Sequence, residues 1–354
     1  MRRIGGMFPL ERIKGGASNG YLDSLHGDVL LMMSGRCALY AALKDADDGR
    51  ERNAYVPAYT CETVLSAYEK AGYNMIPYDI DPEGMKPVFV ESVIPSISVL
   101  GLCGYYGFCR YDHDFVIACH NAGVTVIQDT THSPLFIDDE ADYAAGSLRK
   151  WMGIASGGVA VKRNGKFSVR PLPSEKEHLE GRYRALELRE KGIETGDASF
   201  DKEASDVFWE TELRLRKIFD IYAGDELSEK IINSFDFNSM ATLRRRNYQT
   251  VLDNLSANDG FKVVFPELSE NDVPSHFTLY AKDRDHFQSY LAEKGVSSTV
   301  YWPRTPLAES IEDFDEKFPG ASYIYDHVVS IQIDQRYDVS DMEFLASVLN
   351  DYHC

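Results

Sequence analysis

Short apolar segments alternate with helical segments through the first half of the chain, and this alternation is the strongest restriction on the fold. Residues 124–128 (VTVIQ) are almost continuously apolar, which is typical of a parallel-sheet strand covered on both faces. Residues 63–72 have the spacing of an amphipathic helix that ends at Gly72. This order predicts an α/β domain with a mostly parallel central sheet flanked by helices. We expect strands at 29–33, 54–57, 74–80, 96–102, 124–128 and 157–161, and further helices after Gly35 and over 112–122.

The second half of the chain has a different character, with charged and polar stretches between shorter apolar segments. Residues 174–191 predict a solvated helix, and the polar stretch 192–205 predicts a surface loop. Ser340 opens a Ser-Asp-Met-Glu sequence typical of a capping box, which predicts the start of a last helix. The other expected elements are helices at 206–219, 243–255 and 285–294 and strands at 262–265, 275–281, 296–301 and 328–333. The predicted parts are an N-terminal arm (1–22), a large α/β domain (23–220), and a linker helix with a smaller α+β domain (221–354).

The charge balance of the 354-residue chain excludes two classes of function. The chain has 37 Lys and Arg against 56 Asp and Glu, which gives a formal net charge of −19. A nucleic-acid binder needs a surplus of basic residues, and so does a polybasic membrane anchor, so neither class fits. An anionic ligand would have to be held by a few local cations inside a negatively charged protein.

Cysteine usage and the lack of a targeting segment predict a cytoplasmic protein. The six cysteines are scattered without a CxxC pair, which argues against a disulfide framework and against a zinc site. The N-terminus has no apolar core of signal-peptide length. The uncharged run 92–109 is interrupted by Pro95 and by glycines, so it predicts a buried strand and a turn and not a membrane span.

Candidate catalytic and ligand-binding residues lie near the ends of the expected strands, which is where open α/β sheets bind ligands. Asp129 ends one expected strand, and His132 follows three residues later. Gly35 opens a helix after another strand, and the free N–H groups of a helix start suit a phosphate. Lys150 follows Ser147 by three residues. Each feature alone is more often structural, as a cap, a turn or a chance pair.

The combination of these features fits pyridoxal 5′-phosphate (PLP). PLP requires a lysine that forms an imine, a carboxylate that keeps the pyridine nitrogen protonated, and a cradle for its phosphate. Lys150, Asp129 and the helix start with Ser147 supply these groups. Partial burial beside a cationic neighbour such as Arg149 would favour the neutral amine of Lys150.

Several segments along the chain together match the motifs of one known family. They are 34–39 (SGRCAL), 56–61 (VPAYTC), 127–132 (IQDTTH), 147–150 (SLRK) with Gly157-Gly158, and 330–333 (SIQI) with 339–341. These segments resemble the DegT/DnrJ/StrS-type sugar aminotransferases, which are PLP enzymes of the aspartate aminotransferase fold (fold type I). The stretch between His132 and Lys150 is short for this family, which places the chain in an atypical branch.

The resemblance implies catalytic roles for three residues. Lys150 would form the internal aldimine with PLP and then act as the general acid and base. Asp129 would pair with the pyridine nitrogen, and His132 would lie against the cofactor near its ring or its O3′.

The resemblance also implies how the cofactor is held. The backbone of Gly35, Arg36 and Cys37 and the Ser147 hydroxyl would bind the phosphate, and Arg36 replaces the usual Thr or Ser. Cys61 stands where many members place an aromatic residue on the pyridine ring, so another residue would have to stack there, with Tyr59 as a candidate.

In this fold the active site lies at the interface of a homodimer. The resemblance implies that the partner subunit supplies residues near the phosphate, and we expect them around Asn238 and in 244–248. Residues 301–304 would approach the substrate from the small domain. Without the resemblance, residues 244–248 would be interpreted as a solvated basic helix face, and the aromatic residues of 301–304 as part of the core.

The function predicted from these features is a PLP-dependent aminotransferase that moves an amino group from an amino acid to a keto group, expected to be on a nucleotide sugar or another sugar. An alternative is a PLP-binding relative without transaminase activity, such as a dehydratase or a regulator. An anionic substrate would need a basic patch, for which Arg36, Arg149 and Arg304 are candidates.

Two other functions fit the sequence less well. Ser147-x-x-Lys150 matches the nucleophile motif of penicillin-binding enzymes, but the chain lacks their Ser-Asp-Asn and Lys-Thr-Gly motifs. A metal hydrolase would use His113, His120, Asp129 and His132, but the first two are seven residues apart on the expected helix and do not form an i, i+4 ligand pair.

Overall fold

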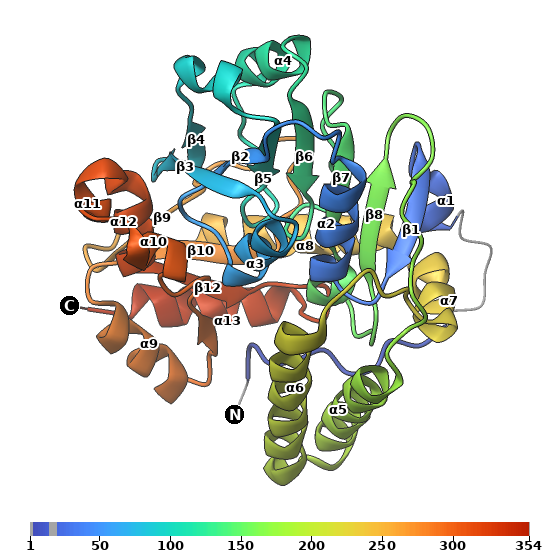
Figure 1. The fold of residues 1–354 in the computed structure, drawn as a ribbon. Coiled ribbons are helices and arrows are strands. Elements are labelled where there is room, and N and C mark those ends of the chain that lie inside the picture. The colour runs from blue at the N-terminus through green and yellow to red at the C-terminus, as the bar shows by residue number, and fades with distance from the viewer. Residues whose placement is uncertain (1–2, 14–19, 354) are drawn as a thin grey trace.

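The protein consists of two sheets flanked by helices (Figure 1), in a computed structural model that describes residues 3–13 and 20–353. Residues 1–2 and 14–19 of the expected arm, and Cys354, lie outside the described residues. The five other cysteines are free thiols. None of the described helices combines enough length and apolarity to cross a lipid bilayer.

The main sheet has eight strands, and its centre is parallel. Strands from β7 to β3 pair in parallel, while β1, β8 and β4 run antiparallel to their neighbours. In spatial order they are β1 (Asp28–Met32), β8 (Gly158–Lys162), β7 (Tyr143–Ser147), β6 (Thr125–Asp129), β5 (Val99–Cys103), β2 (Asn53–Pro57), β3 (Asn74–Asp81) and β4 (Lys86–Val88). The prediction of an α/β fold with a mostly parallel sheet is therefore confirmed.

The smaller sheet is antiparallel and is built from the C-terminal part of the chain. Its order is β11 (Ser298–Thr299), β12 (Val328–Gln332), β10 (His276–Ala281) and β9 (Phe261–Val263). The helices of the described residues are α1 (Tyr21–Ser24), α2 (Gly35–Asp45), α3 (Glu62–Lys70), α4 (His113–Asn121), α5 (Lys176–Thr195), α6 (Ala198–Ile218), α7 (Glu226–Ser234), α8 (Phe237–Asn254), α9 (Arg284–Glu293), α10 (Pro306–Ser310), α11 (Phe314–Lys317), α12 (Pro319–His327) and α13 (Val339–Asn350), with short 3₁₀ helices η1 (Glu91–Ser96) and η2 (Leu148–Lys150).

The main sheet separates two apolar cores, because successive side chains of a strand point to opposite faces. Val99 of β5 belongs to the core that contains Ala38 and Ala42 of α2. Leu100, the next residue, belongs to a core that also contains α4 residues such as Phe115 and residues of the smaller sheet. The small side chains of α2 let this helix pack closely on the sheet, which brings its N-terminus to the carboxyl ends of the strands.

The surface loop expected at 192–205 is not present. These residues form the end of α5, the turn and the start of α6 in a helical hairpin. Gly196 ends α5 in a left-handed conformation (φ 71°), and Asp197 caps α6 by accepting from the Ser199 N–H (2.8 Å). Arg189 of α5 pairs with Asp201 of α6. The loop prediction was wrong because these polar residues cap and connect two packed helices.

Two smaller expectations also differ from the structure. Of the expected strand 296–301, Ser298–Thr299 pairs with β12 as β11, and Val296 forms an isolated parallel bridge with Ile4. Helix α13 is capped by Asp338 in a capping box with Asp341, so the cap lies two residues before Ser340.

Candidate active site

A cavity of about 200 Å³ lies where β5, β6 and β7 end, beside the start of α2. Its wall contains most of the residues that the sequence predicts to bind or act on a cofactor. Cys37 is the exception, because it is buried within α2 and its backbone N–H donates to Oγ of Ser34 (3.2 Å). The predicted residues in the wall are Gly35, Arg36, Cys61, Asp129, His132, Ser147 and Lys150.

The start of α2 lies directly against the end of β7. A Cβ added to Gly35 would lie 2.9 Å from Cβ of Ser147, closer than real Cβ contacts, so this approach requires glycine. The Ser147 hydroxyl and the N–H groups of the first turn of α2 therefore lie at one end of the cavity. The first N–H groups of a helix have no intrahelical partner, and this arrangement suits an anion.

Lys150 ends η2, the short helix that follows β7. Its Nζ lies 2.8 Å from Nε2 of His132. The indole N–H of Trp151 donates to the backbone oxygen of Thr131 (2.8 Å), which ties the lysine turn to the turn that carries His132. The rings of Tyr301 and Trp302 lie 4.5 Å and 5.5 Å from Nζ, so aromatic side chains of the C-terminal part of the chain cover the amine.

The hydrogen bonds around His132 indicate the protonation state of Lys150. The backbone N–H of Tyr106 donates to Nδ1 of His132 (3.3 Å), so the neutral ring carries its proton on Nε2. That proton points at Nζ of Lys150, which can accept it only as the neutral amine. Burial lowers the pKa of Lys150, and burial together with Lys150 and His276 lowers the pKa of His132 well below its ordinary value, so both shifts favour the neutral forms.

Asp129 is the last residue of β6, and its side chain reaches the cavity. Its carboxylate accepts from the backbone N–H of Thr131 (2.8 Å). Burial raises the pKa of Asp129, while the hydrogen bonds from Thr131 oppose this rise. A carboxylate in this position would retain a proton on a basic nitrogen placed next to it.

A cluster of arginines lies at the α2 end of the cavity. Nη2 of Arg36 donates to Oγ1 of Thr63 (3.0 Å). Nη2 of Arg149 lies 3.3 Å, and Nη1 of Arg182 lies 2.9 Å, from Oε1 of Glu212. Neither Arg182 nor Glu212 was expected here, because the charge-rich sequence of α5 is typical of a solvated helix and Glu212 lies on a different helix, α6.

Trp302 lines the cavity beside His132, whereas Tyr59 does not line it. Cys61 caps α3, its Sγ accepting from the Thr63 N–H (3.4 Å). Tyr59 is buried behind the cavity, where its ring packs against Trp302 (centroids 5.3 Å apart) and its hydroxyl contacts that of Tyr106. Trp302 stacks on His132, with centroids 5.3 Å apart and an interplanar angle of 26°.

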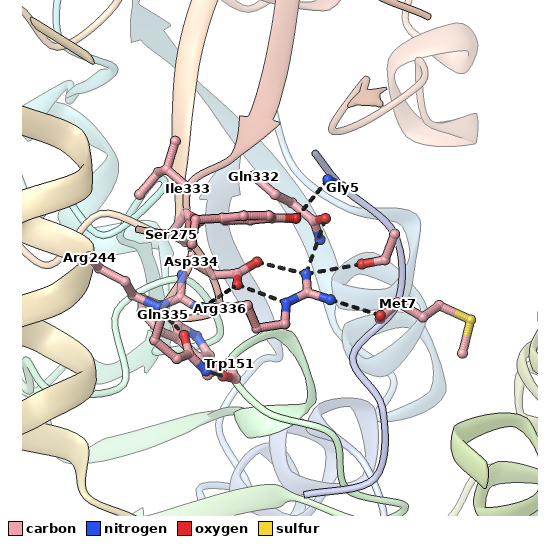
Figure 2. A network of polar contacts seen from close by, with 12 residues as sticks. Gly5, Met7, Trp151, Arg244, Ser275, Gln332, Ile333, Asp334, Gln335 and Arg336 are labelled. Atoms are coloured by element: carbon pink, nitrogen blue, oxygen red, sulfur yellow. Dashed lines mark hydrogen bonds and ion pairs between the residues drawn. The ribbon is translucent and has the colours of Figure 1, made fainter. Parts of the chain in front are cut away.

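Arg244, expected in the segment that reaches a partner's site, is instead buried in its own chain. Figure 2 shows it beside Gln335, whose Oε1 accepts from Nε of Arg244 (2.9 Å) and whose amide donates to the backbone oxygen of Trp151 (2.7 Å). The guanidinium also stacks on the Trp151 ring (4.4 Å). Arg336 continues the same network to Asp334 and to the backbone of Met7. These contacts support the lysine turn from the side away from the cavity.

Two other groups of sequence candidates lie outside the cavity wall. Arg304 donates to Asp315 (2.7 Å) and Ser322 (2.8 Å), so its charge is used within its own part of the fold. His113 and His120 lie on α4, where they face Asp138 and Asp142. Among the described residues, no group of three or more His, Cys, Asp or Glu side chains could hold a metal ion.

The sheet order and the cavity at the strand ends define the fold of the PLP-dependent transferases of fold type I. No protein-family model matches the sequence, and no curated protein matches it. Solved structures of aminotransferases, a DegT DnrJ EryC1 StrS aminotransferase among them, share the fold at low sequence identity.

Three of these structures illustrate the similarity. PseC of Helicobacter pylori, an aminotransferase involved in the biosynthesis of pseudoaminic acid, has a TM-score of 0.68 at 11% identity and covers 98% of each chain. DesV of S. venezuelae has a TM-score of 0.67 at 16% identity, over 98% of this chain and 90% of its own. A DegT DnrJ EryC1 StrS aminotransferase from Brucella abortus has a TM-score of 0.64 at 15% identity, over 93% and 86%.

Proposed function

We propose that this protein is a PLP-dependent aminotransferase that uses Lys150 to move an amino group from an amino acid to a keto group. The observation that carries the proposal is the amine of Lys150, held 2.8 Å from a neutral His132 in a cavity bounded by Asp129 and by the start of α2. The fold shared with the solved sugar aminotransferase CalS13 of Micromonospora echinospora supports it.

The residues of the cavity fit PLP at each of its functional groups. Buried nitrogens of Arg36 and Arg149 have no hydrogen-bond partner among the described residues, and they lie beside the helix start suited to a phosphate. Asp129 offers a carboxylate for a ring nitrogen, and Lys150 offers an amine for an aldehyde. Bound PLP supplies that aldehyde and an electron-withdrawing pyridine ring.

The chain's own residues would divide the work of catalysis. Lys150 is neutral, so Nζ has the lone pair needed for attack on a carbonyl and for taking up and returning a proton at substrate carbon. Asp129 would hold a proton on the pyridine nitrogen. Trp302 and Tyr301 would limit the access of water to Nζ, which keeps the amine neutral.

The acceptor in this proposal is the keto group of a sugar, with a nucleotide sugar as the first candidate. PseC, an aminotransferase involved in the biosynthesis of pseudoaminic acid, is among the structures of the same fold, which supports this choice. We further propose a homodimer in the cytoplasm, where free cysteines are stable, and a division into two domains near residue 220, because each part has its own sheet.

A PLP-binding protein without transaminase activity is the competing proposal. The two differ in whether an amino acid converts the bound cofactor to its amine form. Lys150 lines the cavity with its amine beside His132, and this favours the aminotransferase, because a protein that only senses the cofactor has no need of a proton carrier there.

Borohydride reduction of the PLP-loaded protein tests the assignment of Lys150. Peptide mass spectrometry should find the reduced cofactor on the peptide that contains Lys150, and Lys150→Ala should abolish this label. Lys166→Ala, which changes a lysine whose side chain is 84% exposed, should leave the label in place. Label spread over surface lysines would contradict the proposal.

A further inference from the structure

The helical hairpin of α5 and α6 forms one wall of the cavity. Phe208, Glu212 and Leu215 line the cavity from α6 at helical spacing, and Arg182 joins them from α5. Figure 1 shows the two helices side by side, extending away from the main sheet. The hairpin thus brings charged side chains from a remote part of the chain to the start of α2.

This wall has more positive than negative charge. Glu212 pairs with Arg149 and Arg182, while Arg36 contacts only the neutral Thr63 hydroxyl among its hydrogen-bond partners. Burial, with Arg149 and Arg182 nearby, lowers the pKa of His178 to about 3, so this histidine adds no charge. Three guanidinium groups beside one carboxylate leave two positive charges uncompensated.

The same arginines have unused hydrogen-bond donors. Arg36 and Arg182 are only 5% and 4% exposed, yet Nε of each has no hydrogen-bond partner among the described residues, and the same holds for Nε and Nη1 of Arg149. Buried charged donors without partners are costly, so they indicate a ligand that the site is built to hold. Arg36 and Arg182 both line the cavity, beside the N-terminus of α2.

We propose that Arg36, Arg149 and Arg182 form a phosphate-binding wall, and that the hairpin of α5 and α6 completes it within a single chain. A phosphate monoester dianion matches the two uncompensated charges, and its oxygens can accept from several guanidinium nitrogens and from the N–H groups of α2. The inference rests on the proposed function in one respect, that the phosphate is that of PLP.

Binding measurements with three ligands test this wall. Calorimetric titrations would use PLP, pyridoxal, which lacks the phosphate, and inorganic phosphate. Arg182→Met should weaken the binding of PLP and of phosphate by about tenfold or more and leave that of pyridoxal unchanged, because a charge-assisted bond to phosphate is lost. Arg184→Met is the matched control, since Arg184 lies on the same helix with its side chain 63% exposed, and it should change none of the three affinities.

Glu212→Gln provides a test of opposite sign. It removes the carboxylate that competes for the arginines, so phosphate and PLP should bind more tightly than to the unchanged protein. Arg182→Lys retains a positive charge, so its affinity for phosphate should lie between those of the unchanged protein and of Arg182→Met. This variant replaces Arg182→Met if the methionine variant does not fold. Unchanged phosphate affinity in the Arg182 variants, or weaker binding in Glu212→Gln, would overturn the proposal. Phosphate binding that depends on Arg182, together with a failure of borohydride to fix the cofactor on Lys150, would support the phosphate-binding wall and contradict the proposed function.

Discussion

Nζ of Lys150 lies 2.8 Å from Nε2 of His132, and the other ring nitrogen of His132 accepts from the backbone N–H of Tyr106. The hydrogen bond from Tyr106 determines which atom donates between His132 and Lys150, because it leaves Nε2 as the protonated nitrogen of a neutral ring. Lys150 must then accept with its lone pair. The structure therefore holds the lysine in the form that reacts with carbonyl groups.

The pH dependence of Lys150 reactivity follows from this arrangement. Burial lowers the pKa of Lys150 below its ordinary value of 10.5, whereas Asp129 opposes this shift. We expect the labelling rate of Lys150 by a small amine reagent, followed by mass spectrometry in the cofactor-free protein, to reach half its maximum below pH 10.5. Asp129→Asn should move this midpoint further down, because it removes a neighbouring negative charge. An upward movement would argue against the contact between these residues.

The same shift predicts that Lys150 lowers the stability of the cofactor-free protein. The unfolded chain binds a proton at Lys150 that the folded chain binds more weakly, so the cost is fully present below the folded pKa and vanishes above about 10.5. Lys150→Met should raise the free energy of unfolding at pH 7 by about 1 kcal/mol or more, since each unit of pKa shift corresponds to about 1.4 kcal/mol. Urea titrations at pH 7 and near pH 10 would measure the free energy of unfolding of both proteins, and the difference between them should be smaller at the higher pH. A less stable variant would contradict this account.

Trp302 should matter for the protonation of Lys150 as well as for ligand binding. Trp302→Ala would admit water to Nζ, so the pKa of Lys150 should rise toward its ordinary value and PLP binding should weaken by about tenfold. Trp302→Phe keeps a ring over His132 and should retain most of both properties. The pH profile of Lys150 labelling and the dissociation constant of PLP would show the difference. An unchanged pH profile in Trp302→Ala would contradict the role of Trp302 in lowering the pKa of Lys150.

The two glycines at the start of β8 should respond differently to alanine. A Cβ on Gly158 would lie 2.0 Å from the backbone oxygen of Ser34, so Gly158→Ala would displace the start of α2 and cost about 1–3 kcal/mol or more. A Cβ on Gly157 would lie 2.5 Å from the terminal methyl of Ile154, a side chain that can move, and 3.4 Å or more from its next neighbours. Thermal unfolding should show a large loss for the first variant and a small one for the second. Equal losses would show that α2 does not depend on this close approach.

Local patterns in the sequence were enough to place the elements that carry the expected cofactor residues. Asp129 ends β6 and Gly35 follows β1, two strands whose inner positions are rich in Val, Ile, Leu and Met, and the ends of such strands can be located from sequence. Strand β7 was not predicted, because its sequence YAAGS is mostly small residues with weak strand preference. Its pairing depends on burial between β6 and β8, which only the tertiary fold supplies.

The hairpin of α5 and α6 could not be predicted for a related reason. Its charged residues indicated a solvated surface, but Arg182 is buried because Glu212 and the cavity lie next to it. One signal was available: His178 and Arg182 share a helical stripe with the apolar Leu179 and Leu186. Charged residues within an apolar stripe indicate a buried polar site, although its partner cannot be identified without the fold.

The half-reaction with an amino acid tests the central proposal most directly. PLP-loaded protein would be mixed with a panel of amino acids, glutamate among them, and the keto acid formed per active site would be measured without an acceptor present. The account predicts about one keto acid per site for at least one donor, with loss of the visible absorbance of the lysine-bound cofactor, and neither change in Lys150→Ala. A protein that fixes PLP on Lys150 but forms no keto acid from any donor would contradict the aminotransferase and favour the binding role.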